Sequence, residues 1–126
     1  MHTIRTLFLG ALAASALALP LRAAELVMVE QRGCVYCQTW HREIGPEKYA
    51  LTDEGAFAPL RVIDLHAPRP GDIAFARPLR ITPTFVLVAD GRELARFEGY
   101  PGEDFFWGIL GMMLNAHTDF EEGGTG

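Results

Sequence analysis

The chain contains two cysteines, Cys34 and Cys37, and only Val35 and Tyr36 separate them. A disulfide across so short a loop removes little entropy from the unfolded chain, so it would stabilise a fold only weakly. The same spacing puts the second thiol close enough to attack a mixed disulfide formed on the first. The pair therefore favours thiol–disulfide exchange over a purely structural role.

The residues around this pair indicate that it lies between a strand and a helix. Residues 25–30 form a short apolar run that predicts a buried strand, and residues 34–43 predict a helix that ends at Gly45-Pro46. At the start of a helix, backbone N–H groups and the helix dipole favour the thiolate form of a cysteine. We therefore expect Cys34 to be the nucleophile and Cys37, one turn further in, to be the resolving thiol.

The rest of the chain predicts an alternation of strands and helices. The expected elements are strands over residues 60–65, 85–89 and 92–98, some helix within 46–59, a short helix over 72–77 capped by Asp72, and a closing helix with Pro101 in its first turn. Asp90-Gly91 is a hairpin-turn signal between the last two strands. The order β-α-β-α-β-β-α predicts an α/β fold with a four-stranded mixed sheet flanked by helices.

The N-terminal residues differ in character from the rest. Arg5 precedes an uncharged apolar run over residues 7–19, Pro20 interrupts that run, and Ala23 and Ala24 follow. This order is typical of a secretory signal peptide, and a run of about 13 residues is shorter than the ~20 that a spanning helix needs. We expect cleavage after Ala23 or Ala24, the alternatives being an uncleaved membrane anchor or a buried first helix.

Length and charge bound the organisation further. A chain of 126 residues suits one domain and is too short for two separate cores. We expect a signal peptide over residues 1–24, one domain over residues 25–118 and a flexible tail over residues 119–126. The formal charge of −5 comes without a basic stripe, which argues against nucleic acid and anionic membranes as partners. Export would carry the two cysteines into a compartment that permits disulfides.

Thr82-Pro83 lies directly before the strand predicted over residues 85–89. Together with the helix-start cysteine pair and the hairpin signal, this position resembles the thioredoxin superfamily. The resemblance implies a cis-proline at Pro83 that faces the cysteines, with Thr82 offering backbone hydrogen bonds to an extended substrate segment.

The same resemblance completes the expected site. Val35 and Tyr36 are expected to belong to the substrate-binding surface. No cofactor is expected beyond the redox-active disulfide between Cys34 and Cys37, and no metal.

Longer segments carry a narrower resemblance. These are residues 32–37 (Arg-Gly-Cys-Val-Tyr-Cys), the insertion with Ile44-Gly45-Pro46 and Asp53-Glu54-Gly55, Ala58-Pro59-Leu60, and residues 99–107. They are similar to the periplasmic thioredoxins of bacterial sulfur-oxidation (Sox) clusters, the SoxS type. That family implies a reductant that keeps a thiol-bearing sulfur-carrier protein active and is recharged through a membrane thiol transporter.

The motif departs from a standard thioredoxin at several positions. Val35-Tyr36 lies between the cysteines, where a standard thioredoxin has Gly-Pro. A Tyr next to the second cysteine, such as Tyr36, is similar to the glutaredoxin motif. Met28 lies where thioredoxins carry a buried Asp. Glu30 is the nearest carboxylate, and we interpret it as a solvated strand end rather than a base.

Two alternative functions remain open from the residues. One is a non-catalytic copper-binding module using Cys34, Cys37 and His41. The other is a glutaredoxin-like or oxidising disulfide exchanger. A zinc site would need further ligands, and the chain has no second cysteine pair.

Overall fold

The computed structural model describes residues 10–11 and 24–122, and its strands form one mixed sheet in the order β2-β1-β3-β4. β1 (Ala24–Glu30) runs parallel to β2 (Leu60–Asp64) and antiparallel to β3 (Thr84–Ala89). β3 pairs in turn with β4 (Arg92–Glu98) across the Asp90-Gly91 hairpin. The predicted four-stranded α/β fold is confirmed. Most of the predicted signal peptide lies outside the described residues.

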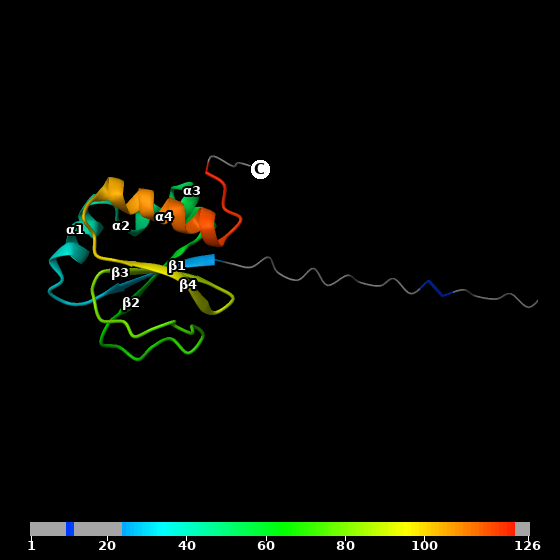
Figure 1. Cartoon of the computed structure of the whole chain (residues 1–126), viewed down its shortest axis with the longest axis horizontal. Coiled ribbons are helices and arrows are strands. Elements are labelled where there is room, and N and C mark those ends of the chain that lie inside the picture. The colour runs from blue at the N-terminus through cyan, green and yellow to red at the C-terminus, as the bar shows by residue number, and fades with distance from the viewer. Residues whose placement is uncertain (1–9, 12–23, 123–126) are drawn as a thin grey trace, which may run out of the picture.

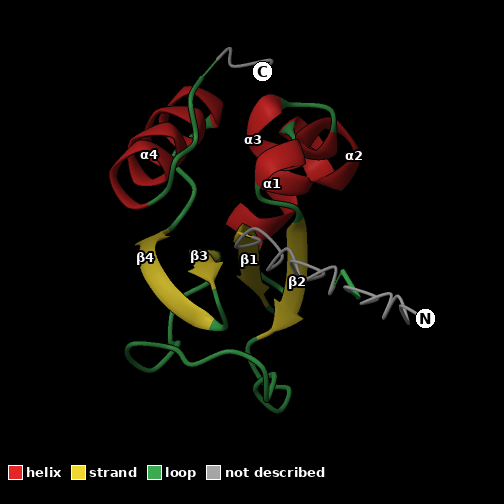
Figure 2. Ribbon diagram, turned by 90° about the vertical axis from the view of Figure 1, so that its right-hand side faces the viewer, coloured by secondary structure: helices red, strands yellow, loops and turns green. Residues whose placement is uncertain are grey.

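The helices gather on one face of this sheet (Figures 1 and 2). Three short helices connect β1 to β2, namely α1 (Val35–Glu43), α2 (Gly45–Ala50) and α3 (Asp53–Phe57), and α4 (Glu103–His117) follows β4. Gly45 has a φ of +70°, a conformation open to glycine, and lets the chain turn from α1 directly into α2. Pro101 precedes α4 instead of lying in its first turn, which corrects the prediction. Within the described residues, no helix has the length and apolar character needed to cross a membrane.

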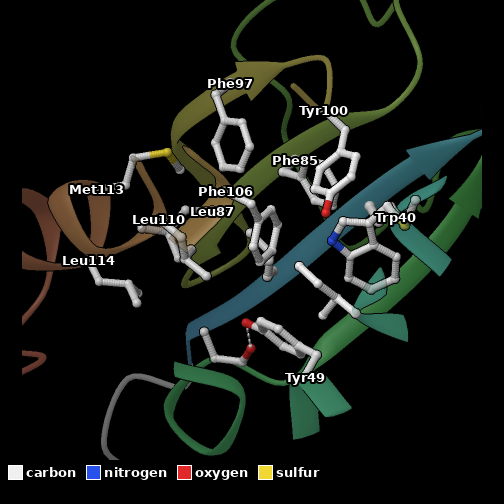
Figure 3. Packing of buried hydrophobic residues seen from close by; sticks show 14 of the residues in the cluster. Trp40, Tyr49, Phe85, Leu87, Phe97, Tyr100, Phe106, Leu110, Met113 and Leu114 are labelled. Carbon is white, nitrogen blue, oxygen red and sulfur yellow. Dashed lines mark hydrogen bonds between the residues drawn. The ribbon is translucent and has the colours of Figure 1, made fainter. Parts of the chain in front are cut away.

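Aromatic rings fill the space between the helices and the sheet (Figure 3). Phe106 of α4 is fully buried, and its ring centroid lies 5.0 Å from that of Phe85 and 5.9 Å from that of Trp40. Leu26 and Met28 of β1 belong to the same cluster because alternate residues of a strand point to the same face. This core fixes α1, which carries the cysteines, against the centre of the sheet.

An irregular segment between β2 and β3, residues 65–83, covers the opposite face of the sheet. Ile73 and Leu79 from this segment cluster with Val27 and Val86, which point away from the helices. The helix predicted over residues 72–77 is therefore wrong, since the structure has no helix between β2 and β3.

The backbone explains why that helix does not form. The Ala74 N–H donates to the Gly91 carbonyl at 2.7 Å, and the Ala74 carbonyl accepts from the Glu93 N–H at 3.0 Å. These groups would otherwise serve a helical hydrogen-bond ladder. The pairing with the β3–β4 hairpin thus overrides the local preference of the sequence.

Candidate active site

Cys34 and Cys37 form a disulfide at the start of α1, with their Cα atoms 5.2 Å apart. Gly33 has a φ of +79°, which lets the chain turn sharply out of β1. Cys34 is the N-cap of α1, and its Sγ accepts the Cys37 N–H at 3.1 Å. Cys34 is half-buried whereas Cys37 is only 2% exposed, so Cys34 is the more accessible of the two to a partner.

The segment around Pro83 lies next to this turn. The Thr82–Pro83 peptide bond is cis, and the Pro83 carbonyl accepts the Gly99 N–H at 2.7 Å. Gln31, at the end of β1, donates its side-chain N–H to Thr82 Oγ1 at 2.7 Å. The structure therefore brings Thr82 and Pro83 beside the cysteine turn. Neither backbone polar group of Thr82 is hydrogen-bonded to another described residue.

Gln31 is a site residue that the sequence analysis missed. Its backbone carbonyl accepts the Cys34 N–H at 3.3 Å, and its side-chain carbonyl lies 2.9 Å from His66 Nε2. No local pattern marks this residue, because His66 and Thr82 come from distant parts of the chain.

Exposed apolar side chains stand next to the disulfide. Val35 and Tyr36 are 65% and 63% exposed, and Ile81, which precedes Thr82, is 49% exposed. Exposed apolar groups that gather in one place are typical of an interaction surface. Val35 and Tyr36 were expected there, and Ile81 is an addition from the structure.

The carboxylate nearest in sequence to the cysteines has a partner. Glu30 Oε2 lies 2.6 Å from Nε2 of His41, on α1, and both side chains are about one third exposed. The interpretation of Glu30 as a strand end that meets only solvent is therefore incomplete. Met28 is fully buried. Within residues 10–11 and 24–122, no group of three or more His, Cys, Asp or Glu side chains could hold a metal ion.

Polar contacts hold the C-terminal end of α1 and the adjacent helix α2. The Tyr100 hydroxyl donates to Glu43, and burial together with this bond raises the pKa of Tyr100 well above its usual range. Lys48 of α2 pairs with Glu103 of α4, which lowers the pKa of Glu103. These contacts tie α1 and α2 to the residues that follow β4.

Tyr49 of α2 is buried within the layer of helices. Its hydroxyl donates to the Ala58 carbonyl at 2.6 Å, and burial raises its pKa far above the ordinary value, with a further contribution from Glu54. The helix that carries the cysteines is thus held at its C-terminal end through Glu43, and the adjacent helix α2 is held through Lys48 and Tyr49.

A cysteine pair at disulfide distance, at the first turn of a helix that packs on a mixed four-stranded sheet, defines a thioredoxin-like thiol–disulfide oxidoreductase. A family model described as a thioredoxin-like domain matches residues 21–113, and the chain belongs to this family. The structure is similar to the crystal structure of the periplasmic thioredoxin SoxS from Paracoccus pantotrophus in its reduced form. The identity is 49%, the TM-score is 0.70, and the match covers 73% of this chain and 96% of that one.

One curated protein also matches over part of its length. The chain is 32% identical over 97 residues to a protein described as ribosomal protein S6 kinase alpha-4 from Mus musculus. The match covers 75% of this chain and 12% of that protein, so the chain spans about one eighth of its relative.

Proposed function

We propose that the protein is a periplasmic protein-disulfide reductase that supports a sulfur-oxidation system. The observation that carries the proposal is the Cys34–Cys37 pair, accessible on the Cys34 side and flanked by Thr82-Pro83. The similarity to a structure described as the periplasmic thioredoxin SoxS supports the location and the sulfur-oxidation role.

The reaction needs only the two thiols of the reduced protein. The Cys34 thiolate attacks a substrate disulfide, forms a bond to one of its sulfurs and releases the other as a thiolate, which takes up a proton. The Cys37 thiolate then attacks Cys34 Sγ, releases the second substrate thiol and closes the Cys34–Cys37 disulfide. Two electrons pass to the substrate, and no bound cofactor takes part.

Substrate binding would use the surface around Cys34. The unpaired backbone groups of Thr82 can bond to an extended substrate segment beside Pro83. Val35 and Tyr36 offer exposed apolar area to the same segment. The partner would be a protein thiol or disulfide, such as a sulfur-carrier protein, and a membrane thiol transporter would return the two electrons.

The location follows from the N-terminal sequence. We propose that residues 1–24 act as a signal peptide and that the domain begins at residue 25. Phe120 is 6% exposed and its ring centroid lies 5.2 Å from that of Phe57, so the domain extends beyond residue 118 and the tail is shorter than the expected residues 119–126. Expression with the natural leader followed by cell fractionation should place the protein in the periplasm. Intact mass should show an N-terminus at Ala24 or Glu25. An unprocessed protein in the cytoplasm would contradict this location.

A turnover assay tests the enzymatic proposal. The protein should accelerate the reduction of insulin disulfides by dithiothreitol, and Cys34→Ser should abolish the acceleration. Gln38→Ala is the matched control, because Gln38 is exposed and adjacent to Cys37 in sequence but provides no thiol. A wild-type protein that gives no acceleration would contradict the reductase assignment.

A further inference from the structure

The side chain of Gln31 links two segments that meet beside Cys34. Its N–H donates to Thr82 Oγ1 at 2.7 Å, and its carbonyl oxygen lies 2.9 Å from His66 Nε2. The backbone N–H of His66 is itself held by Asp64 Oδ1 at 2.7 Å, at the end of β2. Because the Gln31 backbone carbonyl also accepts the Cys34 N–H, this side chain has a fixed place relative to the disulfide.

The direction of these bonds determines what the Thr82 hydroxyl can do. The side-chain carbonyl of Gln31 only accepts, so His66 donates to it through Nε2, and the Gln31 amide then donates to Thr82. A hydroxyl group has one proton and two acceptor lone pairs. The amide occupies a lone pair of Thr82 Oγ1, and no described residue accepts the hydroxyl proton. A half-buried donor is therefore left free beside Pro83.

We propose that Gln31 is a positioning residue that holds the Thr82 hydroxyl as an acceptor and so leaves its proton for a backbone carbonyl of the substrate. The inference rests on the proposed function and extends it, because it names a side-chain donor that recognises a peptide and not a small disulfide. The unpaired backbone groups of Thr82 lie at the same place, so an extended peptide that bonds to them passes next to this hydroxyl.

An exchange equilibrium on a single cysteine measures this contact. In a Cys37→Ser background, Cys34 is converted to its mixed disulfide with 2-mercaptoethanol, which has no carbonyl group. The neutral peptide acetyl-Ala-Ala-Cys-Ala-Ala-amide is then added until equilibrium, and intact mass after acid quenching gives the two adducts. One S–S bond breaks and another forms on the same Cys34 sulfur, so there is no net oxidation. The free Cys34 thiolate stands on neither side of this equilibrium, so its stability does not affect the measured preference.

Two substitutions should lower the preference for the peptide by the same amount. Thr82→Val removes the hydroxyl at nearly constant shape and should reduce the preference about three- to tenfold, the contribution of one neutral hydrogen bond. Gln31→Glu keeps a bridge, because a carboxylate accepts from both His66 and Thr82, but it uses the hydroxyl proton. It should give the same loss, and combining it with Thr82→Val should add nothing further.

Matched variants separate this effect from charge and from folding. Gln38→Glu makes the same charge change beside the cysteines and should stay within about twofold of the parent. Thr82→Ser retains a hydroxyl and should preserve the preference. Thermal unfolding of each variant confirms that it is folded, and Thr82→Val still tests the contact if Gln31→Glu fails to fold.

Each result supports or overturns the inference. If Gln31→Glu keeps the parent preference while Thr82→Val loses it, Gln31 does not orient the hydroxyl. If Thr82→Val keeps the preference, the hydroxyl does not contact the peptide. The exchange requires no turnover, so a protein that shows the preference but does not reduce insulin contradicts the proposed function alone. Insulin reduction without the preference contradicts only the role of Gln31.

Discussion

Arg96 and Glu93 form an ion pair on β4, with Nε of Arg96 2.5 Å from Oε1 of Glu93 and side chains only 2% and 3% exposed. Arg96 also donates to the carbonyls of Arg77 and Pro78, at 2.8 and 3.1 Å. Glu93 accepts the Ala76 N–H at 2.8 Å. The pair therefore holds in place the irregular segment that leads to Pro83, a segment that contains no helix.

Breaking this pair should destabilise the protein strongly. Glu93→Ala leaves the Arg96 guanidinium without its carboxylate partner, and removing one member of a buried pair costs about 3–5 kcal/mol. Urea unfolding near neutral pH measures the loss. Glu98→Ala is the matched control, since it removes a more exposed carboxylate 3.7 Å from Arg77 and should cost less than about 1 kcal/mol. A loss below that value for Glu93→Ala would show that the pair does not hold the segment.

The same carboxyl group should make stability depend on pH. Burial tends to raise the pKa of Glu93, but hydrogen bonds from Arg96 and the Ala76 N–H outweigh it, so the pKa lies below its ordinary value of 4.5. The unfolded chain therefore binds this proton more readily. The stabilisation is present in full above about pH 4.5 and is lost as the pH falls through the folded-state pKa.

Unfolding at several pH values tests this dependence. The stability difference between wild type and Glu93→Gln should be constant from about pH 7 to about pH 5.5 and should shrink towards about pH 3. A difference that grows on acidification would mean that burial dominates and that the pKa of Glu93 is raised. Glu98→Gln, measured in parallel, controls for general acid effects on the fold.

Much of the fold could be predicted because its elements carry local signals. The strands stand out as short apolar runs, and Asp90-Gly91 marks the hairpin between the last two. The segment over residues 72–77 could not be predicted in this way, because its backbone groups are paired with the β3–β4 hairpin. Sequence propensity describes only neighbours along the chain, whereas Ala74 takes its partners from residues nearly twenty positions away.

The same distinction between local and long-range signals applies to the residues of the candidate site. Cys34, Cys37, Thr82 and Pro83 were predicted because two short motifs mark them, and the structure brings the motifs together. Gln31 carries no such mark, since its contacts with His66 and Thr82 exist only once three separate segments have met.

The two cysteines should differ in reactivity once reduced. Cys34 is the more accessible, lies at the helix start and can accept a backbone N–H, whereas Cys37 is nearly buried. Iodoacetamide near neutral pH should therefore label Cys34 first, as mass spectrometry of peptides can show. Cys37→Ser should accumulate a mixed disulfide with a protein substrate. Faster labelling of Cys37 would reverse the proposed roles.

The apolar surface beside the disulfide should contribute to protein binding. Tyr36→Ala should raise the KM for a protein disulfide roughly fivefold, equivalent to about 1 kcal/mol, because it removes contact area at the proposed interface. Reduction of the small substrate 5,5′-dithiobis(2-nitrobenzoate) should change less than about twofold. Leu51→Ala is the control, since Leu51 is 88% exposed but lies between α2 and α3. Equal effects of both variants would exclude a specific role for Tyr36.

The reduction potential decides the direction of electron flow. Strong stabilisation of the Cys34 thiolate would favour the reduced form and make the protein an oxidant. Among the described residues, the group that donates to Cys34 Sγ is the Cys37 N–H, and the apolar Val35 side chain adds no donor. We therefore expect a potential near the thioredoxin value of about −270 mV, away from the oxidant value of about −120 mV. For two electrons this gap corresponds to roughly 7 kcal/mol, at about 1.4 kcal/mol per 30 mV, so equilibration with a glutathione redox buffer resolves it.

Val35→His should raise the potential by adding a donor beside Cys34, and Gln38→His is its control one position beyond Cys37. A wild-type value above about −150 mV would mean that the protein delivers disulfides, and the reductase assignment would then be wrong.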